Sequence, residues 1–266
     1  MFNQFHQSLS SYLPLLLLIS IIFAHNAVGI EAKEVKKKEP KSNKADKSVT
    51  LLFLDCDGVL NDSKSDVSQL YVLENKELEN LSFIIKETDN LYIVMTSTWR
   101  YTDEARKQFK NQIKEFNNDK NHHRIPNPIS YTPILQGNRL EEILTWLKEN
   151  TTFLDDEIKK SLEKNIDSSK GQEQLPIKKI KNYNGKGRNK SKLKVNNLIA
   201  IDDLDILNDE GTKPEWKDFM AGHFIRTNKK YGLTETETRL AIKVLNNDQS
   251  SETKDLLEKC QKLELQ

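Results

Sequence analysis

The sequence predicts a three-layer α/β domain in which helices cover both faces of a mostly parallel central sheet. Two observations lead to this prediction. Short apolar runs of the kind found in buried parallel strands occur at residues 51–54, 91–95, 198–201 and 223–226. Segments with apolar residues at helical spacing lie between or after them. Parallel strands need a crossover connection, which is usually a helix, so this alternation indicates a parallel sheet.

The first strand is followed by two carboxylates one residue apart. After the apolar residues the chain continues Asp55-Cys56-Asp57-Gly58-Val59-Leu60. Gly58 permits a turn that most residues resist, so both carboxylates can point into the crevice beyond the sheet, where open α/β folds bind ligands. Two carboxylates there can help to hold Mg²⁺, one serving as nucleophile and the other as proton carrier. The alternative is an ordinary polar turn after a strand.

The second and third strands also end in polar groups. Residues 91–95 lead into Thr96-Ser97-Thr98, whose hydroxyls suit a phosphate oxygen, and residues 198–201 lead into Asp202-Asp203. Separate turns would not be expected to produce such a convergent set. The pattern therefore favours one site built at a common edge of the sheet.

Helices are predicted at residues 74–86, 105–116 and 235–245, where apolar residues recur at helical spacing. Between Asp57 and Leu91 there is room for only a short flap and one helix, so we expect a minimal cap. Residues 117–128 form a polar connection that contains His122 and His123. A histidine pair suggests a metal site, but an exposed loop is favoured because no second cluster of ligands accompanies it.

These segments resemble the motifs of the haloacid dehalogenase-like (HAD) phosphohydrolases. Residues 55–60 resemble the first motif, Thr96 the second and Asp202-Asp203 the fourth. Arg139, in Gly137-Asn138-Arg139-Leu140-Glu141-Glu142-Ile143, matches the third, where most of the superfamily carries lysine. Several further segments are similar to the HAD domain of Swiss-army-knife RNA repair proteins: Thr96-Ser97-Thr98-Trp99-Arg100, Thr132-Pro133, Glu142-Ile143, Trp146-Leu147 and Tyr231-Gly232-Leu233-Thr234.

The resemblance, which covers residues 50 to 245 or so, implies a Rossmann-like fold and a Mg²⁺-dependent phosphatase. Asp55 would become an aspartyl-phosphate that water then hydrolyses. Asp57 would protonate the leaving oxygen and later deprotonate the water. Mg²⁺ would be bound by Asp55, by the backbone carbonyl of Asp57 and by one of the pair Asp202 and Asp203, and which of the two touches the metal stays open.

The resemblance also implies a set of phosphate-binding groups. The Thr96 hydroxyl and the Ser97 amide would hold a phosphoryl oxygen, and Arg139 would neutralise developing charge. Arg100 is a candidate for contact with the substrate phosphate, whereas Trp99 is expected to pack. Two alternatives remain: the threonines at 96 and 98 would cap the helix that begins near residues 102–104, and Arg139 would be a surface residue.

An open crevice favours bulky phosphorylated substrates, such as a polynucleotide end or a protein, although small esters stay open. The alternative function is a secreted binding protein that recognises a phosphorylated ligand without turning it over. The 41 basic and 40 acidic residues give a net charge of +1, which argues against a general polyanion binder.

The N-terminal residues 1–29 have the pattern of a signal peptide, because the apolar run at 13–24 is shorter than the roughly 20 residues of a membrane span. We therefore expect the secretory pathway or the extracellular space, and no stable membrane span after cleavage. An uncleaved signal anchor that tethers the protein to a membrane is the alternative. Residues 30–48 are predicted as a disordered charged linker.

The catalytic domain is predicted at residues 49–246, with a low-complexity insertion at about 150–194 and a C-terminal helical tail at 247–266. The second half of the insertion is basic enough to touch a polyanion, but a solvated low-complexity loop is the favoured interpretation. A disulfide between Cys56 and Cys260 is not expected, since alternation turns Cys56 into the sheet packing. A glycan on the sequon at Asn61 would crowd the site. The oligomeric state is left open.

Overall fold

The computed structural model describes residues 48–61, 71–135, 138–156, 158–160, 162 and 192–262. All of them belong to a single unit, Asp46–Gln266. The predicted signal peptide, nearly all of the charged linker, most of the insertion and most of the flap after Asn61 lie outside the described residues, so these stay predictions. In the described part of the chain, no helix has both the length and the apolar character that crossing a membrane requires.

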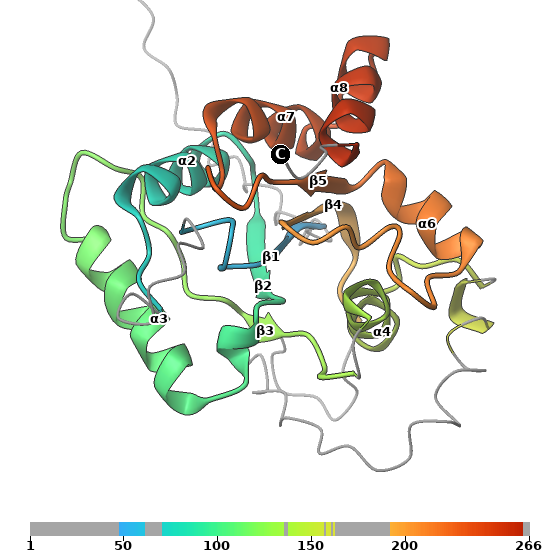
Figure 1. The fold of residues 1–266 in the computed structure, drawn as a ribbon, viewed down its shortest axis with the longest axis horizontal. Coiled ribbons are helices and arrows are strands. Elements are labelled where there is room, and N and C mark those ends of the chain that lie inside the picture. Colours follow the sequence, from blue (N-terminus) through green and yellow to red (C-terminus); the bar gives the residue numbers. More distant parts are fainter. Residues whose placement is uncertain are drawn as a thin grey trace, which may run out of the picture. The chain divides into compact units, whose positions relative to one another are not determined.

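A five-stranded, all-parallel sheet in the order β3-β2-β1-β4-β5 forms the centre of the domain (Figure 1). Its strands are β1 (Val49–Leu54), β2 (Leu91–Met95), β3 (Ser130–Tyr131), β4 (Val195–Asp202) and β5 (Phe224–Arg226). The four predicted strands and the α/β class are confirmed. The fifth strand, β3, has only two residues, too few to leave a periodic signal in the sequence.

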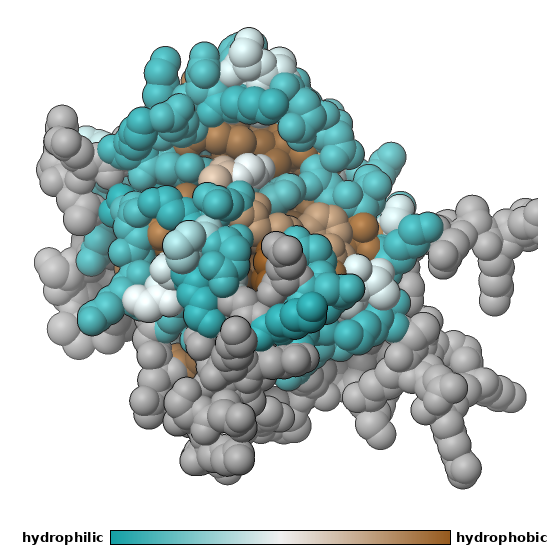
Figure 2. All heavy atoms as spheres, turned by 90° about the vertical axis from the view of Figure 1, so that its right-hand side faces the viewer, coloured by the Kyte–Doolittle hydropathy of each residue, from teal (hydrophilic) through white to brown (hydrophobic). Residues whose placement is uncertain are grey.

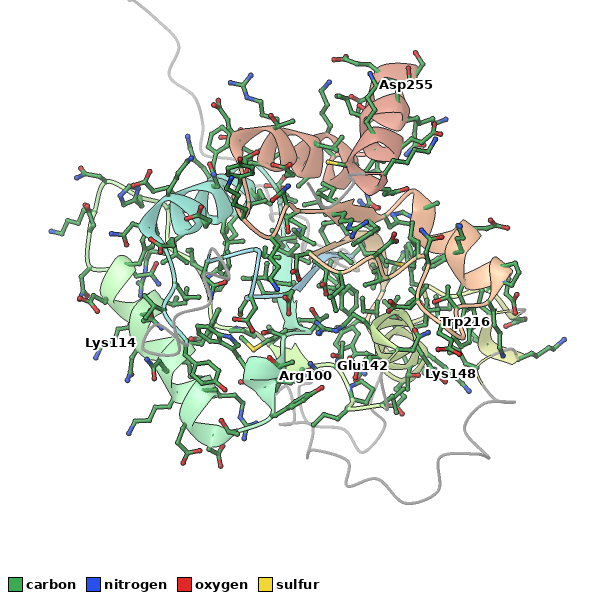
Figure 3. The ribbon with its side chains drawn as sticks, viewed as in Figure 1. Arg100, Lys114, Glu142, Lys148, Trp216 and Asp255 are labelled. Carbon is green, nitrogen blue, oxygen red and sulfur yellow. The ribbon has the colours of Figure 1, made fainter. Side chains whose placement is uncertain are left out.

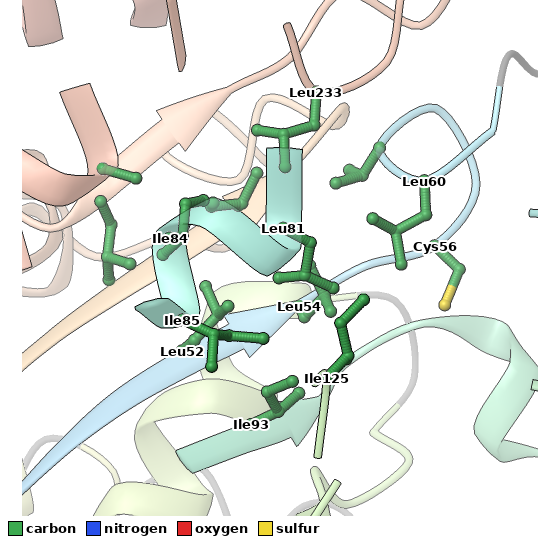
Figure 4. Packing of buried hydrophobic residues seen from close by; sticks show 14 of the residues in the cluster. Leu52, Leu54, Cys56, Leu60, Leu81, Ile84, Ile85, Ile93, Ile125 and Leu233 are labelled. Atoms are coloured by element: carbon green, nitrogen blue, oxygen red, sulfur yellow. The ribbon is translucent and has the colours of Figure 1, made fainter. Parts of the chain in front are cut away.

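Strand β1 has a continuous run of apolar residues, and successive side chains of a strand point to opposite faces of the sheet, so it contributes to the core on both faces. Leu52 and Leu54 belong to one hydrophobic cluster, whereas Leu51 and Phe53 belong to a second cluster on the opposite face. Figure 4 shows Leu52 and Leu54 packed against side chains of the neighbouring helix, including Leu81 and Ile85. Burying each such side chain contributes about 1.5–3 kcal/mol, so the central strand anchors both layers.

Helices cover both faces of the sheet, as predicted. One face carries α2 (Asn75–Lys86), α3 (Asp103–Phe116), α7 (Glu235–Leu245) and α8 (Ser251–Gln261), and the other carries α4 (Arg139–Asn150) and α6 (Pro214–Ala221). The helix α6 was not predicted, since its eight residues bury only Trp216 and Met220. The three-layer architecture is confirmed.

Side-chain caps set where two helices near the site begin. The hydroxyl of Thr102 accepts a hydrogen bond from the Ala105 amide at the start of α3. Asn138 caps α4 by accepting from the Glu141 amide at 2.8 Å. This cap makes Arg139 the first residue of α4 and directs the chain toward the carboxyl edge of the sheet.

Within the predicted C-terminal tail, residues Ser251–Gln261 form α8, which packs into the domain. Leu257 and Cys260 join the cluster around β1. The side-chain amide of Gln261 donates to the carbonyls of Ala221 and Phe224 at 2.7 and 2.9 Å, so α8 is tied to β5. Both cysteines are free and buried, as expected.

The face on the α6 side of the molecule is largely hydrophilic, with hydrophobic atoms visible in recesses between hydrophilic rims (Figure 2). Charged residues make up 30% of the chain, and most of the long charged side chains in Figure 3 point outward. Buried charges are therefore exceptional here, and five of the seven in the described residues form one connected group: Asp55, Arg100, Arg139, Glu142 and Asp202.

Candidate active site

Three carboxylates meet where β1 and β4 end. One oxygen from each of Asp55, Asp202 and Asp203 lies within 4.8 Å of the others. Asp55 is only 4% exposed and Asp202 only 1%. Clustered carboxylate oxygens are the ligands that Mg²⁺ prefers, so this donor set fits the metal predicted for the site. The Asp57 carboxylate lies outside the group, and the predicted metal contact of its backbone carbonyl stays a prediction.

Burial and mutual repulsion raise the pKa of all three carboxyls. Burial, followed by the charge of Asp202, raises the pKa of Asp55 to about 7. Burial also raises the pKa of Asp202 to about 6, and burial with the charge of Asp55 raises that of Asp203 to about 6. In each case burial is the largest cause, so the ionised forms of these carboxyls are disfavoured chiefly by loss of hydration, and a bound cation would offset that cost.

Gly58 allows Asp203 to approach the first motif. The glycine has φ +71°, and a Cβ atom at this position would lie 2.6 Å from Cγ of Asp203. The Thr227 hydroxyl donates to the Gly58 carbonyl at 2.8 Å and so pins the turn to the end of β5. Any side chain at residue 58 would therefore push the third carboxylate out of the group.

Arg139 links the nucleophile candidate to the fourth motif. Its Nη1 donates to Oδ1 of Asp55 and to Oδ2 of Asp202, at 3.1 Å in both cases. Burial alone would lower the pKa of Arg139, but the nearby carboxylates raise it above its usual range. The side chain is 9% exposed, so the alternative of a surface residue is wrong.

Three donors surround the carboxylate of Asp57. The Trp99 indole N–H donates at 2.9 Å, and the Asn61 amide and the Thr98 hydroxyl each donate at 3.3 Å. Trp99 was predicted only to pack. It is buried as predicted, but its indole N–H also donates to the Asp57 carboxylate. Asn61 is buried and uses its amide nitrogen for Asp57, which argues against glycosylation at this sequon.

Thr96 lies directly after β2, and its hydroxyl is buried without a hydrogen-bond partner within the described ranges. Its amide donates to the Leu54 carbonyl at 2.9 Å, which fixes the residue beside the end of β1. Neither Thr96 nor Thr98 caps α3, because Thr102 does so. An unpartnered buried hydroxyl suits the predicted role of holding a phosphoryl oxygen.

Arg100 is not a substrate ligand, contrary to our prediction. The side chain is fully buried. All five of its N–H groups bond inside the protein: to the carbonyls of Thr96, Ser97, Thr132 and Pro133 and to the carboxylate of Glu142. Figure 3 shows Arg100 and Glu142 side by side. No donor is left for a phosphate, so Arg100 instead fixes the loop that follows β2.

Ser97 is likewise enclosed, and its hydroxyl accepts from the Trp99 amide at 3.3 Å. The predicted contact of its backbone amide with substrate stays a prediction. Glu142 also belongs to this network, although the sequence analysis named it only as part of the family resemblance and gave it no role. It accepts from Arg100 at 2.6 Å and lies 3.5 Å from Nε of Arg139, three residues earlier in α4. The i, i+3 spacing of Arg139 and Glu142 was the available signal.

The histidine pair is not part of the site. His122 lies 3.6 Å from Asp119 and 3.8 Å from Glu79 and stacks on Phe116. Over the described part of the chain, the group formed by Asp55, Asp202 and Asp203 is the one arranged to hold a metal.

A parallel α/β domain with this carboxylate edge is Rossmann-like, as in the HAD phosphohydrolases. Residues 51–172 match the family model described as the HAD domain in Swiss Army Knife RNA repair proteins, which confirms the resemblance seen in the sequence. The matched segment contains Asp55, Thr96 and Arg139, whereas Asp202 and Asp203 follow it in the chain and reach the site through the fold. Neither the curated proteins nor the solved structures include a match.

The raised pKa of Asp203 yields a test of the metal site. A carboxyl whose pKa rises on folding stabilises the protein below its ordinary pKa of 3.8 and loses that contribution as the pH rises through about 6. At pH 8 without divalent cations, Asp203→Asn should therefore be more stable than the parent by roughly 1 kcal/mol, or about 2–4 °C in melting temperature. Melting curves in chelator at pH 4 and pH 8 check this, with the difference expected at pH 8 alone.

Adding Mg²⁺ to the same experiment should reduce the stability advantage of the variant over the parent. Mg²⁺ should raise the melting temperature of the parent at pH 8 and raise that of Asp203→Asn less, because one ligand is lost. A variant less stable than the parent at both pH values in chelator would contradict the proposed repulsion.

Proposed function

We propose that this protein is a Mg²⁺-dependent phosphatase that forms an aspartyl-phosphate on Asp55 and removes the terminal phosphate of a polynucleotide. A HAD domain implies a phosphohydrolase, and the buried acidic group fits a HAD magnesium site. The observation that carries the proposal is the shared contact of Arg139 with Asp55 and Asp202. This contact joins the first, third and fourth motifs at one point.

In the proposed reaction, a carboxylate oxygen of Asp55 attacks phosphorus in line with the leaving oxygen, and the bond to the leaving group breaks. Asp57 gives a proton to that oxygen. A water molecule then attacks the phosphorus of the aspartyl-phosphate, Asp57 takes a proton from the water, and phosphate departs with Asp55 restored.

The other residues of the site stabilise negative charge and position the reacting groups. Mg²⁺, when bound, would be held by the acidic group and would offset the negative charge that meets an anionic substrate. Arg139 fixes one oxygen of Asp55 and offers a positive charge next to the transferring group. The unpartnered Thr96 hydroxyl is available to a phosphoryl oxygen.

Replacing the nucleophile tests the reaction. Asp55→Asn should lower turnover of an aryl phosphate with Mg²⁺ by at least about 10³-fold, because an amide oxygen cannot form the covalent intermediate. Asp205→Asn is the matched control: Asp205 lies on the same loop as Asp203 but bonds to Arg226 and Asn208, and the control should keep its activity. Steady-state rates measure both. Equal rates for Asp55→Asn and the parent would leave the non-catalytic binding protein as the better hypothesis.

Two substitutions of Arg139 separate the effect of its positive charge from the effect of its hydrogen-bonding geometry. Arg139→Met should lower kcat by about 10²–10³-fold, the usual cost of removing a positioned donor from a developing charge. Arg139→Lys keeps the charge but cannot reach Glu142 and the two carboxylates together, so we expect an intermediate loss. Single-turnover rates at saturating Mg²⁺ check the order parent, lysine variant, methionine variant. A lysine variant as inactive as the methionine variant would contradict a role for charge.

A polynucleotide substrate is supported by a rigid aromatic turn beside the first motif. Tyr231 is 55% exposed, and the Lys230 ammonium lies 5.0 Å from the centre of its ring. The turn is held in place because the Leu233 amide donates to the Val59 carbonyl at 2.8 Å. An exposed ring next to lysine suits a stacked base and its phosphate, and base stacking contributes about 1–3 kcal/mol.

Changing Tyr231 should separate long substrates from short ones. Tyr231→Ala should lower kcat/KM for a phosphorylated oligonucleotide at least about fivefold, whereas Tyr231→Phe should not. Neither change should alter kcat/KM for an aryl phosphate. Phe83→Ala is the control, since Phe83 is also exposed and pairs with Lys86 at 5.6 Å, but on α2. Equal losses on both substrates would contradict the stacking role.

A further inference from the structure

The two oxygens of Asp57 lie in different environments. Oδ1 accepts from the Trp99 indole nitrogen at 2.9 Å and from the Asn61 side-chain nitrogen at 3.3 Å. An indole N–H and an amide NH₂ are donors only. A proton on Oδ1 would occupy one of the two lone-pair positions that these donors use, so the neutral acid cannot carry its proton there without breaking at least one of the two contacts.

The orientation of Asn61 is fixed by the backbone. The Gly58 amide donates to Oδ1 of Asn61 at 2.9 Å, which leaves the NH₂ group of Asn61 facing Asp57. Reversing the side-chain amide would set two donors against each other and two acceptors against each other. The backbone turn at Gly58 therefore orients Asn61, and Asn61 in turn holds the Asp57 carboxylate.

Oδ2 of Asp57 faces a group of another kind. Its neighbour is the Thr98 hydroxyl at 3.3 Å, which is exposed. A hydroxyl can donate to the carboxylate and can accept from the carboxylic acid. Oδ2 therefore tolerates both the charged and the protonated state, which a proton carrier must pass between.

The indole is held rigidly enough to impose this asymmetry. Trp99 is fully buried, and its ring meets Tyr71 and Phe109 edge to face, with ring centres 5.0 and 6.3 Å away. Its amide also donates to the Ser97 hydroxyl. The N–H group therefore has one position relative to the end of β2.

We propose that Trp99 is a positioning residue which, together with Asn61, assigns the transferable proton of Asp57 to Oδ2. This inference rests on the proposed function. In the first step the proton leaves Oδ2 for the leaving oxygen as its bond to phosphorus breaks. In the second step Oδ2 takes a proton from the attacking water, so that Asp57 ends the cycle in its starting state.

The dependence on the leaving group tests this assignment. Alkyl phosphates need protonation of the leaving oxygen far more than 4-nitrophenyl phosphate does. Trp99→Phe should therefore lower kcat for an alkyl phosphate at least about tenfold more than for 4-nitrophenyl phosphate, the effect of one hydrogen bond to a charged group. Asp57→Asn should show the same trend more strongly, and adding Trp99→Phe to it should cost little more.

Trp216→Phe is the matched control. Trp216 is equally buried, but its indole nitrogen has no hydrogen-bond partner in the described part of the chain, so this change removes packing alone. It should affect both substrates equally. If Trp99→Phe fails to fold, Asn61→Ala removes the second donor without touching the aromatic cluster and should show the same leaving-group dependence.

The outcomes separate this inference from the proposed function. An inactive Asp55→Asn together with equal losses on both substrates for Trp99→Phe and Asn61→Ala would overturn the role of Trp99 and leave the phosphatase standing. Turnover that survives Asp55→Asn would overturn both.

Discussion

The contact of Arg139 with Asp55 and Asp202 is the interaction on which the site depends. Three carboxylates within 4.8 Å repel one another, and two unit charges about 4 Å apart interact by roughly 4 kcal/mol near a protein surface. Arg139 touches two of the three and so allows them to stay buried before any cation binds. A buried cluster of this kind has no structural advantage over an apolar one, so its presence indicates a site and not a device for stability.

Arg139 is itself held by a chain of contacts that reaches the second motif. Glu142 lies against both Arg139 and Arg100, and Arg100 bonds to the carbonyls of Thr96 and Ser97. The third motif and the loop after β2 are therefore placed by a common set of buried charges. A change at Arg100 would therefore act on catalysis through the positions of Thr96 and Arg139, because all five N–H groups of Arg100 are used inside the protein.

The sequence predicted the strands and the acidic edge because their signals are local. Apolar runs ending in Asp55 and Asp202 need no knowledge of the fold, and parallel strands bring their ends together. The fate of Arg100 could not be predicted in this way, since a basic residue beside a phosphate-binding loop normally faces the ligand. Its burial is decided by Glu142, 42 positions later. The hydrogen bond from Trp99 to Asp57 was not predicted for the same reason, because only the folded chain determines where the indole N–H points.

The first motif contains two aspartates whose surroundings suit different tasks. Asp55 is buried beside two other carboxylates and forms an ion pair with Arg139. This environment suits a metal ligand that also serves as a nucleophile. Asp57 is partly exposed and surrounded by neutral donors, which hold a carboxylate without committing it to a metal. The turn at Gly58 separates these environments within three residues, since it brings Asp203 toward Asp55 and Asn61 toward Asp57. Division of labour between nucleophile and proton carrier therefore follows from the path of the backbone.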